Sequence, residues 1–508
     1  MNQTTLQTQF LFTFVGGIVI DFLKNFDGTS RKPRQVQIDA LEWLANDWHK
    51  HKISVISAPV GSGKSALARA IQISTTAGII TPSNLLIRQY RETYPSVNYL
   101  MGKTHYTCNS GLSCKDWIDV LDQPACSNCP YTTCRSEASK GSATFFNPMS
   151  FYYLFSKERP KESNTLVIDE AHQLSSMILM LCGTRISKSK FGFNKNCLNE
   201  LYLIQWLKDH ERRLKKLTDQ YTSQGKFDRV IELVDDYEHI YLTRRGLEED
   251  AQNYAIWTSE GKLYGRKDTF LNIKPIRPPR FITRRILSAN HLIFMSGTIS
   301  PIDMQDLLPD TPYRYLDLPS PIPAAQRPIY YRPTSYPMNW QTDPKLIAAS
   351  IEEIIKLNPG QNTIIHVTYS MVKQLLPHFK IPILHNTAEN KDAVLAEFKS
   401  KGGVLLAGGM AEGIDLPGAL CRINIIPKLA YPDLKDPVVQ KRKALEDGDD
   451  WYNLQTLNKL VQQAGRSTRT VDDYSKTYIL DPGFVWRFKK YRDKLPKSFV
   501  ESIVWNKE

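Results

Sequence analysis

The sequence predicts an α/β protein built from two parallel-sheet halves that are joined by a linker. Continuous apolar runs recur along the 508 residues, and most are followed by a turn and a helix-like segment. Examples are ISVIS before APVGSGKSALARAIQI, TLVID before EAHQL, and NTIIHV before TYSMVKQLL. Apolar strands that alternate with helices are typical of parallel sheets. A proline-rich stretch, residues 318–337, separates the two halves and is interpreted as an interdomain linker.

Two regions interrupt this alternation. Residues 106–134 contain five of the eight cysteines of the chain. Residues 176–285 combine helical periodicity with dense charge, which predicts a helical insertion.

The composition of the chain indicates which class of partner it binds and in which cellular compartment it works. The formal net charge of +13 favours a polyanion such as nucleic acid, although a basic surface that only confers solubility fits it equally well. The apolar run at residues 10–23 is too short to span a bilayer and is interrupted by Asp21, so we interpret it as a buried strand or helix. We expect a cytoplasmic monomer with no membrane association, in which clustered cysteines bind metal rather than form disulfides.

The segment APVGSGKS, residues 58–65, follows an apolar strand and opens a helix, which is the context that a phosphate-binding loop requires. Its backbone N–H groups would hold the phosphates of ATP. Lys64 would neutralise phosphate charge, and the Ser65 hydroxyl would ligate Mg²⁺. An alanine stands where the general motif has its first glycine, and the alternative is a glycine-rich turn. The residues assigned to the nucleotide here are Gly61, Ser62, Gly63, Lys64 and Ser65.

The segment TLVIDEAH is an apolar strand that ends in two adjacent carboxylates. Asp169 would hold Mg²⁺, and Glu170 would orient or deprotonate the attacking water. The alternative is a solvated helix start, since carboxylates suit helix N-termini. Downstream of a phosphate-binding loop, the catalytic interpretation is favoured.

This order of motifs resembles superfamily two helicases. SGTIS (residues 296–300) resembles their Ser-Ala-Thr element, and GGMAEGIDLPG (residues 408–418) resembles their fifth motif. The resemblance implies nucleotide-binding roles for Gly413 and Asp415. RKPRQVQ places Arg34 and Gln37 at the spacing of an adenine-reading element, although that short pattern is common by chance.

QQAGRSTR (residues 462–469) matches the sixth motif of these helicases. The resemblance implies that Gln462, Arg466 and Arg469 face the nucleotide across the cleft between two domains. An arginine in that position stabilises the charge that develops during phosphoryl transfer.

The cysteine segment lies between the phosphate-binding loop and the paired carboxylates, and this placement resembles the XPD/DinG branch, which carries a 4Fe-4S domain there. The resemblance implies Cys108, Cys114, Cys126 and Cys129 as ligands, with Cys134 as an alternative to Cys114. Four thiolates also suit structural zinc, and spacing alone does not separate the two metals. The position of the segment and its Cys-Pro-Tyr favour the cluster by analogy.

The same resemblance implies two RecA-like motor domains with an iron–sulfur insertion and a helical arch-like insertion. Motor domain 1 would comprise residues 1–104, 146–175 and 286–317. The cluster domain would be residues 105–145, the arch-like domain residues 176–285, and motor domain 2 residues 318–508.

The function expected is an ATP- and Mg²⁺-dependent DNA helicase that moves 5′→3′ along single-stranded DNA and opens forked duplexes. One alternative is a translocase that strips proteins or acts on RNA–DNA hybrids. Another is a nucleic-acid-binding module with zinc and no hydrolysis, which Lys64, Glu170 and the arginines of the sixth motif disfavour. The polarity rests on the resemblance alone.

Overall fold

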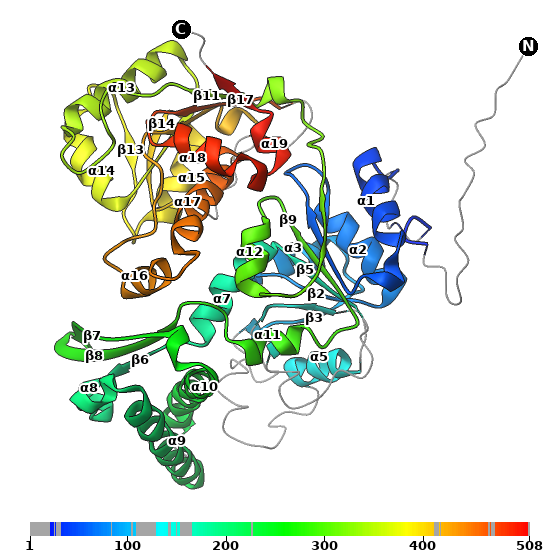
Figure 1. The fold of residues 1–508 in the computed structure, drawn as a ribbon, viewed down its shortest axis with the longest axis vertical. Helices are drawn as coiled ribbons and strands as arrows, with labels where there is room; N and C mark the ends of the chain where they lie inside the picture. Colours follow the sequence, from blue (N-terminus) through cyan, green and yellow to red (C-terminus); the bar gives the residue numbers. More distant parts are fainter. Residues whose placement is uncertain are drawn as a thin grey trace, which may run out of the picture.

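The computed structural model describes residues 21–24, 26, 32–82, 84–102, 105–107, 129–140, 144–148, 150–152, 165–224, 227–410, 416, 418–465, 468 and 473–505. Within them the chain forms two seven-stranded sheets and one three-stranded sheet. In Figure 1 the first sheet lies at the right, the second at the top left, and the small sheet with its helices at the bottom left.

The first sheet is parallel throughout and has the strand order β10-β1-β9-β5-β2-β4-β3. Its strands are β1 (Ile53–Ser57), β2 (Gly78–Ile80), β3 (Asn98–Leu100), β4 (Thr144–Phe146), β5 (Thr165–Asp169), β9 (His291–Ser296) and β10 (Arg314–Asp317). The helices that accompany it are α1 (Gln35–Ala45), α2 (Lys64–Thr75), α3 (Asn84–Thr93), α5 (Pro130–Ser139), α7 (Leu174–Leu181), α11 (Arg280–Ile286) and α12 (Pro301–Leu307). Strands β1 and β5 are buried along their whole length, as expected of strands covered on both faces.

The second sheet is also parallel throughout and has the order β13-β14-β12-β15-β16-β11-β17. Its strands are β11 (Ile329–Tyr331), β12 (Thr363–Val367), β13 (Leu384–His385), β14 (Val404–Gly408), β15 (Ile423–Ile426), β16 (Lys476–Ile479) and β17 (Ile503–Trp505). Its helices are α13 (Pro344–Leu357), α14 (Tyr369–Leu375), α15 (Lys391–Lys401), α16 (Pro437–Lys443), α17 (Gly448–Ala464), α18 (Phe484–Tyr491) and α19 (Lys497–Val500). The prediction of an α/β fold with two parallel-sheet halves is therefore confirmed.

The insertion after α7 is only partly helical, which corrects the expectation of a helical domain. Two long helices, α9 (Glu200–Ser223) and α10 (Phe227–Glu249), pack on an antiparallel sheet of order β6-β8-β7. The strands are β6 (Thr184–Ser187), β7 (Tyr254–Leu263) and β8 (Arg266–Pro275), and the short helix α8 (Lys188–Phe191) follows β6. The charged periodicity of α9 and α10 does not continue into residues 254–275, which form β7 and β8 instead.

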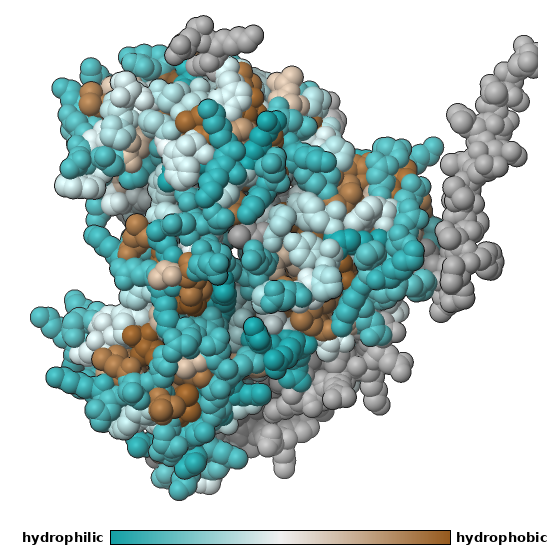
Figure 2. Space-filling model, in the orientation of Figure 1, coloured by the Kyte–Doolittle hydropathy of each residue, from teal (hydrophilic) through white to brown (hydrophobic). Residues whose placement is uncertain are grey.

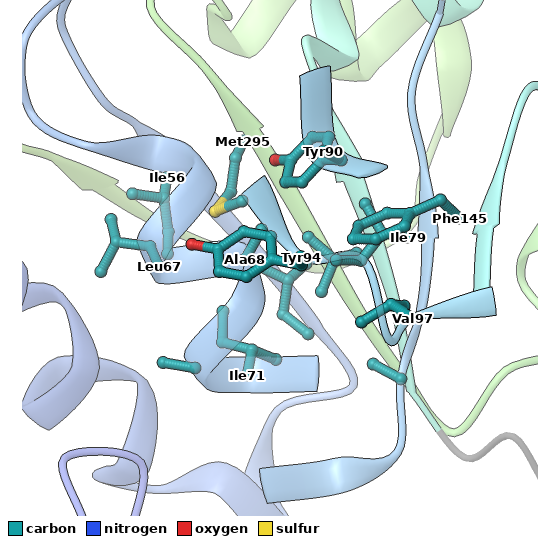
Figure 3. Close-up of a cluster of buried hydrophobic side chains, with 14 of the residues drawn as sticks. Ile56, Leu67, Ala68, Ile71, Ile79, Tyr90, Tyr94, Val97, Phe145 and Met295 are labelled. Atoms are coloured by element: carbon teal, nitrogen blue, oxygen red, sulfur yellow. The ribbon is translucent and has the colours of Figure 1, made fainter. Parts of the chain in front are cut away.

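The core of the first sheet fixes the helix that follows the phosphate-binding loop. Leu67, Ala68 and Ile71 on the inner face of α2 pack into a buried cluster, which also contains Ile79 and Phe145 from neighbouring strands (Figure 3). This packing holds the start of α2 against the carboxyl ends of the strands.

No helix in the described part of the chain is both long enough and apolar enough to cross a membrane.

Candidate active site

The loop between β1 and α2 adopts the conformation that its glycines permit. Gly61 and Gly63 have φ angles of +83° and +81°, in the left-handed region where side chains are strained. At Gly63 a Cβ atom would lie 2.2 Å from Nε2 of Gln37. Any other residue would be strained by this φ angle and would have to displace the side chain of Gln37. Backbone N–H groups at the N-terminus of a helix can bind an anion, and α2 begins at this loop.

The paired carboxylates lie beside this loop because of the strand order. Strand β9 separates β1 from β5, and parallel strands present their carboxyl ends at the same edge of a sheet. A cavity of about 310 Å³ forms at this edge. It is lined by Arg34, Val60, Gly61, Gly63, Lys64, Ser65, Leu86, Asp169 and Glu170. The structure thus brings together most of the described residues that the sequence assigns to ATP and Mg²⁺.

Lys64 and Glu170 face each other across the cavity. Nζ of Lys64 lies 3.7 Å from Oε1 of Glu170 and donates a hydrogen bond to the carbonyl oxygen of Ala58 at 3.3 Å. Both side chains are mostly buried, so neither charge is fully solvated. A phosphate group that enters the cavity would compete with Glu170 for the ammonium group of Lys64.

Asp169 is the most buried acid of the site, with 3% of its surface exposed. Burial and the neighbouring charge of Glu170 raise its pKa to about 6, against the lowering influence of Lys64 and of a hydrogen bond from Tyr90. The Tyr90 hydroxyl donates to Oδ2 of Asp169 at 2.9 Å and also bonds with the side chain of Ser65. An oxygen-rich position of this kind suits a hard cation such as Mg²⁺.

Tyr90 contacts the candidate site, and the sequence did not predict it there. It comes from α3, and its ring packs on Phe145 with centroids 4.5 Å apart, at the edge of the cluster in Figure 3. Burial and the adjacent carboxylates raise its pKa well above its usual value, so the hydroxyl keeps its proton and remains a donor. A single tyrosine in an amphipathic helix gives no signal of this role in the sequence.

A second polar connection runs from the carboxylates to the segment SGTIS. Nδ1 of His172 lies 2.7 Å from the Ser296 hydroxyl and 3.5 Å from Oε2 of Glu170. The Ser296 hydroxyl also accepts from the backbone N–H of Thr298 at 3.2 Å. Glu170 itself has a φ of +48°, which is strained for a residue with a side chain, and such strain clusters at functional sites.

Arg34 and Gln37 both contact the backbone of the loop, and Arg34 also lines the cavity. Nη1 of Arg34 donates to the carbonyl oxygen of Gly61, and Nε2 of Gln37 donates to that of Gly63 at 3.3 Å. Gln37 also caps its own helix by accepting from the backbone N–H of Arg34 at 2.9 Å. Both side chains thus support the loop in this conformation.

The remaining predicted residues are only partly described. Gln462 lies on the last turn of α17 and is not among the residues that line the cavity. Arg466, Arg469, Gly413 and Asp415 lie outside the described residues, as do Cys108, Cys114 and Cys126.

Two of the clustered cysteines are described. Cys129 is buried immediately before α5, and Cys134 is half-buried within that helix. Burial raises the pKa of the Cys134 thiol, which shares a hydrogen bond with Tyr106. The described residues include no group of three or more His, Cys, Asp or Glu arranged to hold a metal.

The chain matches two family models, one after the other. A model described as type III restriction enzyme, res subunit, matches residues 30–200, and a helicase C-terminal domain model matches residues 351–502. The first match contains the phosphate-binding loop and the paired carboxylates, and the second covers most of the second sheet.

Two curated proteins are similar over part of the chain. The chain is 27% identical to the ATP-dependent DNA helicase YoaA of Escherichia coli (strain K12) over 183 residues, which are 34% of this chain and 29% of YoaA. It is 36% identical to the regulator of telomere elongation helicase 1 homolog of Drosophila melanogaster over 99 residues, which are 17% of this chain and 10% of that protein. The chain therefore matches less than a third of the length of either relative.

The fold is similar to that of solved XPD proteins. The structure named XPD helicase superposes with a TM-score of 0.60 at 17% identity, covering 94% of this chain and all of the other. The Xpd4 structure from S. tokodaii gives a TM-score of 0.54 at 15% identity, covering 93% of this chain and 100% of the other. Identities this low establish the fold alone.

Proposed function

We propose that the chain is an ATP-dependent DNA helicase of the XPD/DinG-like type within superfamily two, and that it travels along single-stranded DNA and separates duplexes. The observation that carries this proposal is the common cavity that Lys64, Ser65, Asp169 and Glu170 line at the edge of the first sheet.

In the proposed mechanism the loop and the start of α2 bind the phosphates of ATP through backbone N–H groups. Lys64 leaves its contact with Glu170 and pairs with the terminal phosphates. Ser65 and Asp169 would hold Mg²⁺, which supplies neutralisation of phosphate charge. Tyr90 fixes both of these oxygen ligands through its hydroxyl.

Glu170, once freed from Lys64, orients the attacking water and accepts its proton. Nδ1 of His172 contacts the other carboxylate oxygen of Glu170 and the hydroxyl of Ser296, and these contacts would hold Glu170 in place. Arg466 and Arg469 would stabilise the charge on the transferred group from the second motor domain, and Gln462 lies in the last turn of α17 just before them.

Coupling between the nucleotide and the two motor domains would run through α12. This helix begins directly after SGTIS, and its Asp303 accepts hydrogen bonds from Nδ2 of Asn458 on α17 at 3.2 and 3.3 Å. Helix α17 in turn leads to the sixth motif. A change at Ser296 would therefore reach both domains through two helices that already touch.

A 4Fe-4S cluster is proposed for the cysteine segment, with Cys108, Cys114, Cys126 and Cys129 as ligands. The position of the segment and the buried site of Cys129 support it, and structural zinc is the alternative. The cluster domain and the arch-like insertion would form the element that splits the duplex.

The test uses a pair of DNA duplexes of the same sequence. One carries a 5′ single-stranded tail and the other a 3′ single-stranded tail. We expect ATP- and Mg²⁺-dependent unwinding of the 5′-tailed substrate and little unwinding of the 3′-tailed one, with Lys64→Ala as the inactive control. DNA-stimulated ATP hydrolysis without strand separation would indicate a translocase instead. No hydrolysis by the wild-type protein would contradict the proposal.

A further inference from the structure

The free end of the hairpin formed by β7 and β8 carries three exposed cations and one exposed aromatic ring. Lys262 lies one residue before the end of β7, Tyr264 occupies the turn, and Arg266 and Lys267 begin β8. Tyr264 is 82% exposed. None of the three cations forms an ion pair with a residue that the structure describes. Figure 1 shows this end of the hairpin extending outward beyond α16.

Folding does not account for these choices. Tyr264 and Gly265 have φ angles of +47° and +81°, so the turn is of the type in which asparagine followed by glycine is preferred. A tyrosine at the first position is strained and gains no packing in return. Lys262 and Lys267 are directly paired across the two strands, and like charges in that arrangement destabilise a hairpin. Backbone strain and charge repulsion that do not stabilise the fold indicate a functional role for these residues.

The chemistry of the tip matches a nucleic-acid strand. Proteins that bind single strands combine cations, which pair with phosphates, with exposed aromatic rings, on which bases stack. Lys262 and Lys267 lie on one face of the hairpin, Arg266 on the other, and Tyr264 between them at the end. An acidic protein would use the cations but would not require the exposed ring.

The base of the hairpin is fixed while its tip is free. Leu271 and Ile273 of β8 are fully buried in the core of the insertion. Strand β6 pairs with β8 only as far as Phe270, so the two strands extend beyond it without a third. On the opposite side Nζ of Lys441 on α16 donates to the carbonyl oxygen of Tyr254 at 2.6 Å. Motor domain 2 therefore holds the hairpin directly.

We propose that the hairpin tip is a nucleic-acid contact, in which Lys262, Arg266 and Lys267 pair with phosphates and Tyr264 stacks on a base. This inference rests on the proposed function and adds a binding surface on the insertion. Because α16 grips the base of the hairpin, the tip would shift along the strand when the motor domains move.

The experiment measures binding of a fluorescein-labelled oligothymidylate by anisotropy over a range of salt concentrations. The double variant Lys262→Ala/Lys267→Ala should reduce the slope of log affinity against log salt by about 1.4, because each phosphate contact on a single strand contributes about 0.7. Removing the same charge from exposed positions on α13, in Lys345→Ala/Lys356→Ala, should leave the slope unchanged.

The tyrosine separates a binding role from a structural one. Tyr264→Asn creates the preferred turn sequence, so it should raise the melting temperature while weakening binding about tenfold. Tyr264→Phe keeps the ring and should bind within about twofold of wild type. If all hairpin variants bound the strand with wild-type affinity and wild-type salt slope, the inference would be overturned. The tip would then bind a partner of another class. Failure of the wild-type protein to bind the strand would instead count against the proposed function.

Discussion

Arg442 on α16 donates a hydrogen bond from Nη2 to Oδ1 of Asp306 on α12 at 2.8 Å, and this buried contact joins the two motor domains. The guanidinium group is completely buried and also binds both oxygens of Asp447, at 2.8 and 2.9 Å. Arg277, which follows β8, reaches Asp447 at 2.6 Å and Asp306 at 3.4 Å. The insertion and both motor domains thus meet in one cluster of charges.

The two carboxylates of this cluster respond differently to burial. Burial raises the pKa of Asp306 above its ordinary value, and the nearby arginines only reduce the shift. Burial also acts to raise the pKa of Asp447, but its bonds to Arg442 and the charge of Arg277 outweigh it and lower the pKa. Asp306, the buried carboxylate of the two, depends on Arg442 for its closest ion pair, whereas Asp447 is partly exposed and also contacts Arg277.

We predict that Arg442→Met will lower the free energy of unfolding by about 3–5 kcal/mol, because it leaves the buried carboxylate of Asp306 without its main partner and removes two hydrogen bonds from Asp447. Denaturant unfolding measures the change. Adding Asp306→Asn to this variant should recover part of the loss. Lys401→Met, which breaks an exposed pair with Glu397, is the matched control and should not move the transition. If Arg442→Met changed the free energy of unfolding as little as Lys401→Met, the charge cluster would contribute little to the stability of the contact between the domains.

Glu170→Gln should bind ATP and hydrolyse it about 10²–10³-fold more slowly, since the amide keeps the shape of the side chain but accepts no proton. Its nucleotide affinity should equal or exceed that of wild type, because Lys64 loses the competing charge at 3.7 Å. Lys64→Ala should instead weaken nucleotide binding. Titration with a fluorescent nucleotide and phosphate-release rates separate the two effects. Near-normal turnover in Glu170→Gln would mean that another group is the base.

Tyr90→Phe should raise the Mg²⁺ concentration needed for half-maximal ATP hydrolysis several-fold. The substitution keeps the ring packed on Phe145 but removes the hydroxyl that bonds Asp169 and Ser65. A buried carboxylate that loses a donor is destabilised by about 1–3 kcal/mol, so unfolding should also require less denaturant. Tyr94→Phe, in the same buried cluster, is the control for loss of a tyrosine hydroxyl. Unchanged Mg²⁺ dependence in Tyr90→Phe would limit the tyrosine to a packing role.

The insertion should lose stability as the pH falls below about 6.5. Burial, with smaller contributions from Arg213 and Lys190, lowers the pKa of His210 to about 4, and its ring stacks on Trp206 at 4.9 Å. The folded state therefore favours neutral imidazole, whereas the unfolded chain takes up a proton near pH 6.5. The contribution of neutral His210 to the free energy of unfolding is fully present above pH 6.5. It is lost progressively as the pH falls to 4, by up to about 3 kcal/mol. His210→Leu should flatten the dependence of the melting temperature on pH, and an unchanged dependence would place its origin elsewhere.

Iron and acid-labile sulfide should be present in protein purified without oxygen, and Cys129→Ser should lose both. Cys134→Ala should retain them, because that thiol lies within α5 and shares a hydrogen bond with Tyr106. The visible absorption spectrum and the metal content are the measurements. If Cys129→Ser kept the iron and Cys134→Ala lost it, Cys134 rather than Cys129 would be the ligand. One tightly bound zinc ion and no iron would contradict the 4Fe-4S assignment.

Local backbone chemistry made the geometry of the candidate nucleotide site predictable from the sequence. Gly61 and Gly63 mark a loop that needs left-handed conformations, and Lys64 begins the helix that follows it. TLVID ends a strand at Asp169, and parallel sheets gather such strand ends at one edge. These rules concern a few consecutive residues and the topology of parallel sheets, so they hold before the packing of the chain is known.

Tertiary structure alone decided the contacts between residues that are distant in the chain. Tyr90 lies 79 positions before Asp169, and Asp306 lies 136 positions before Arg442. The hairpin of β7 and β8 was missed because its residues follow two strongly helical, charged segments, and the buried core of the insertion selects strands for them. A tyrosine, an arginine or a segment of mixed polarity has many permitted environments, and only the burial and pairing that the folded chain imposes assign it to one.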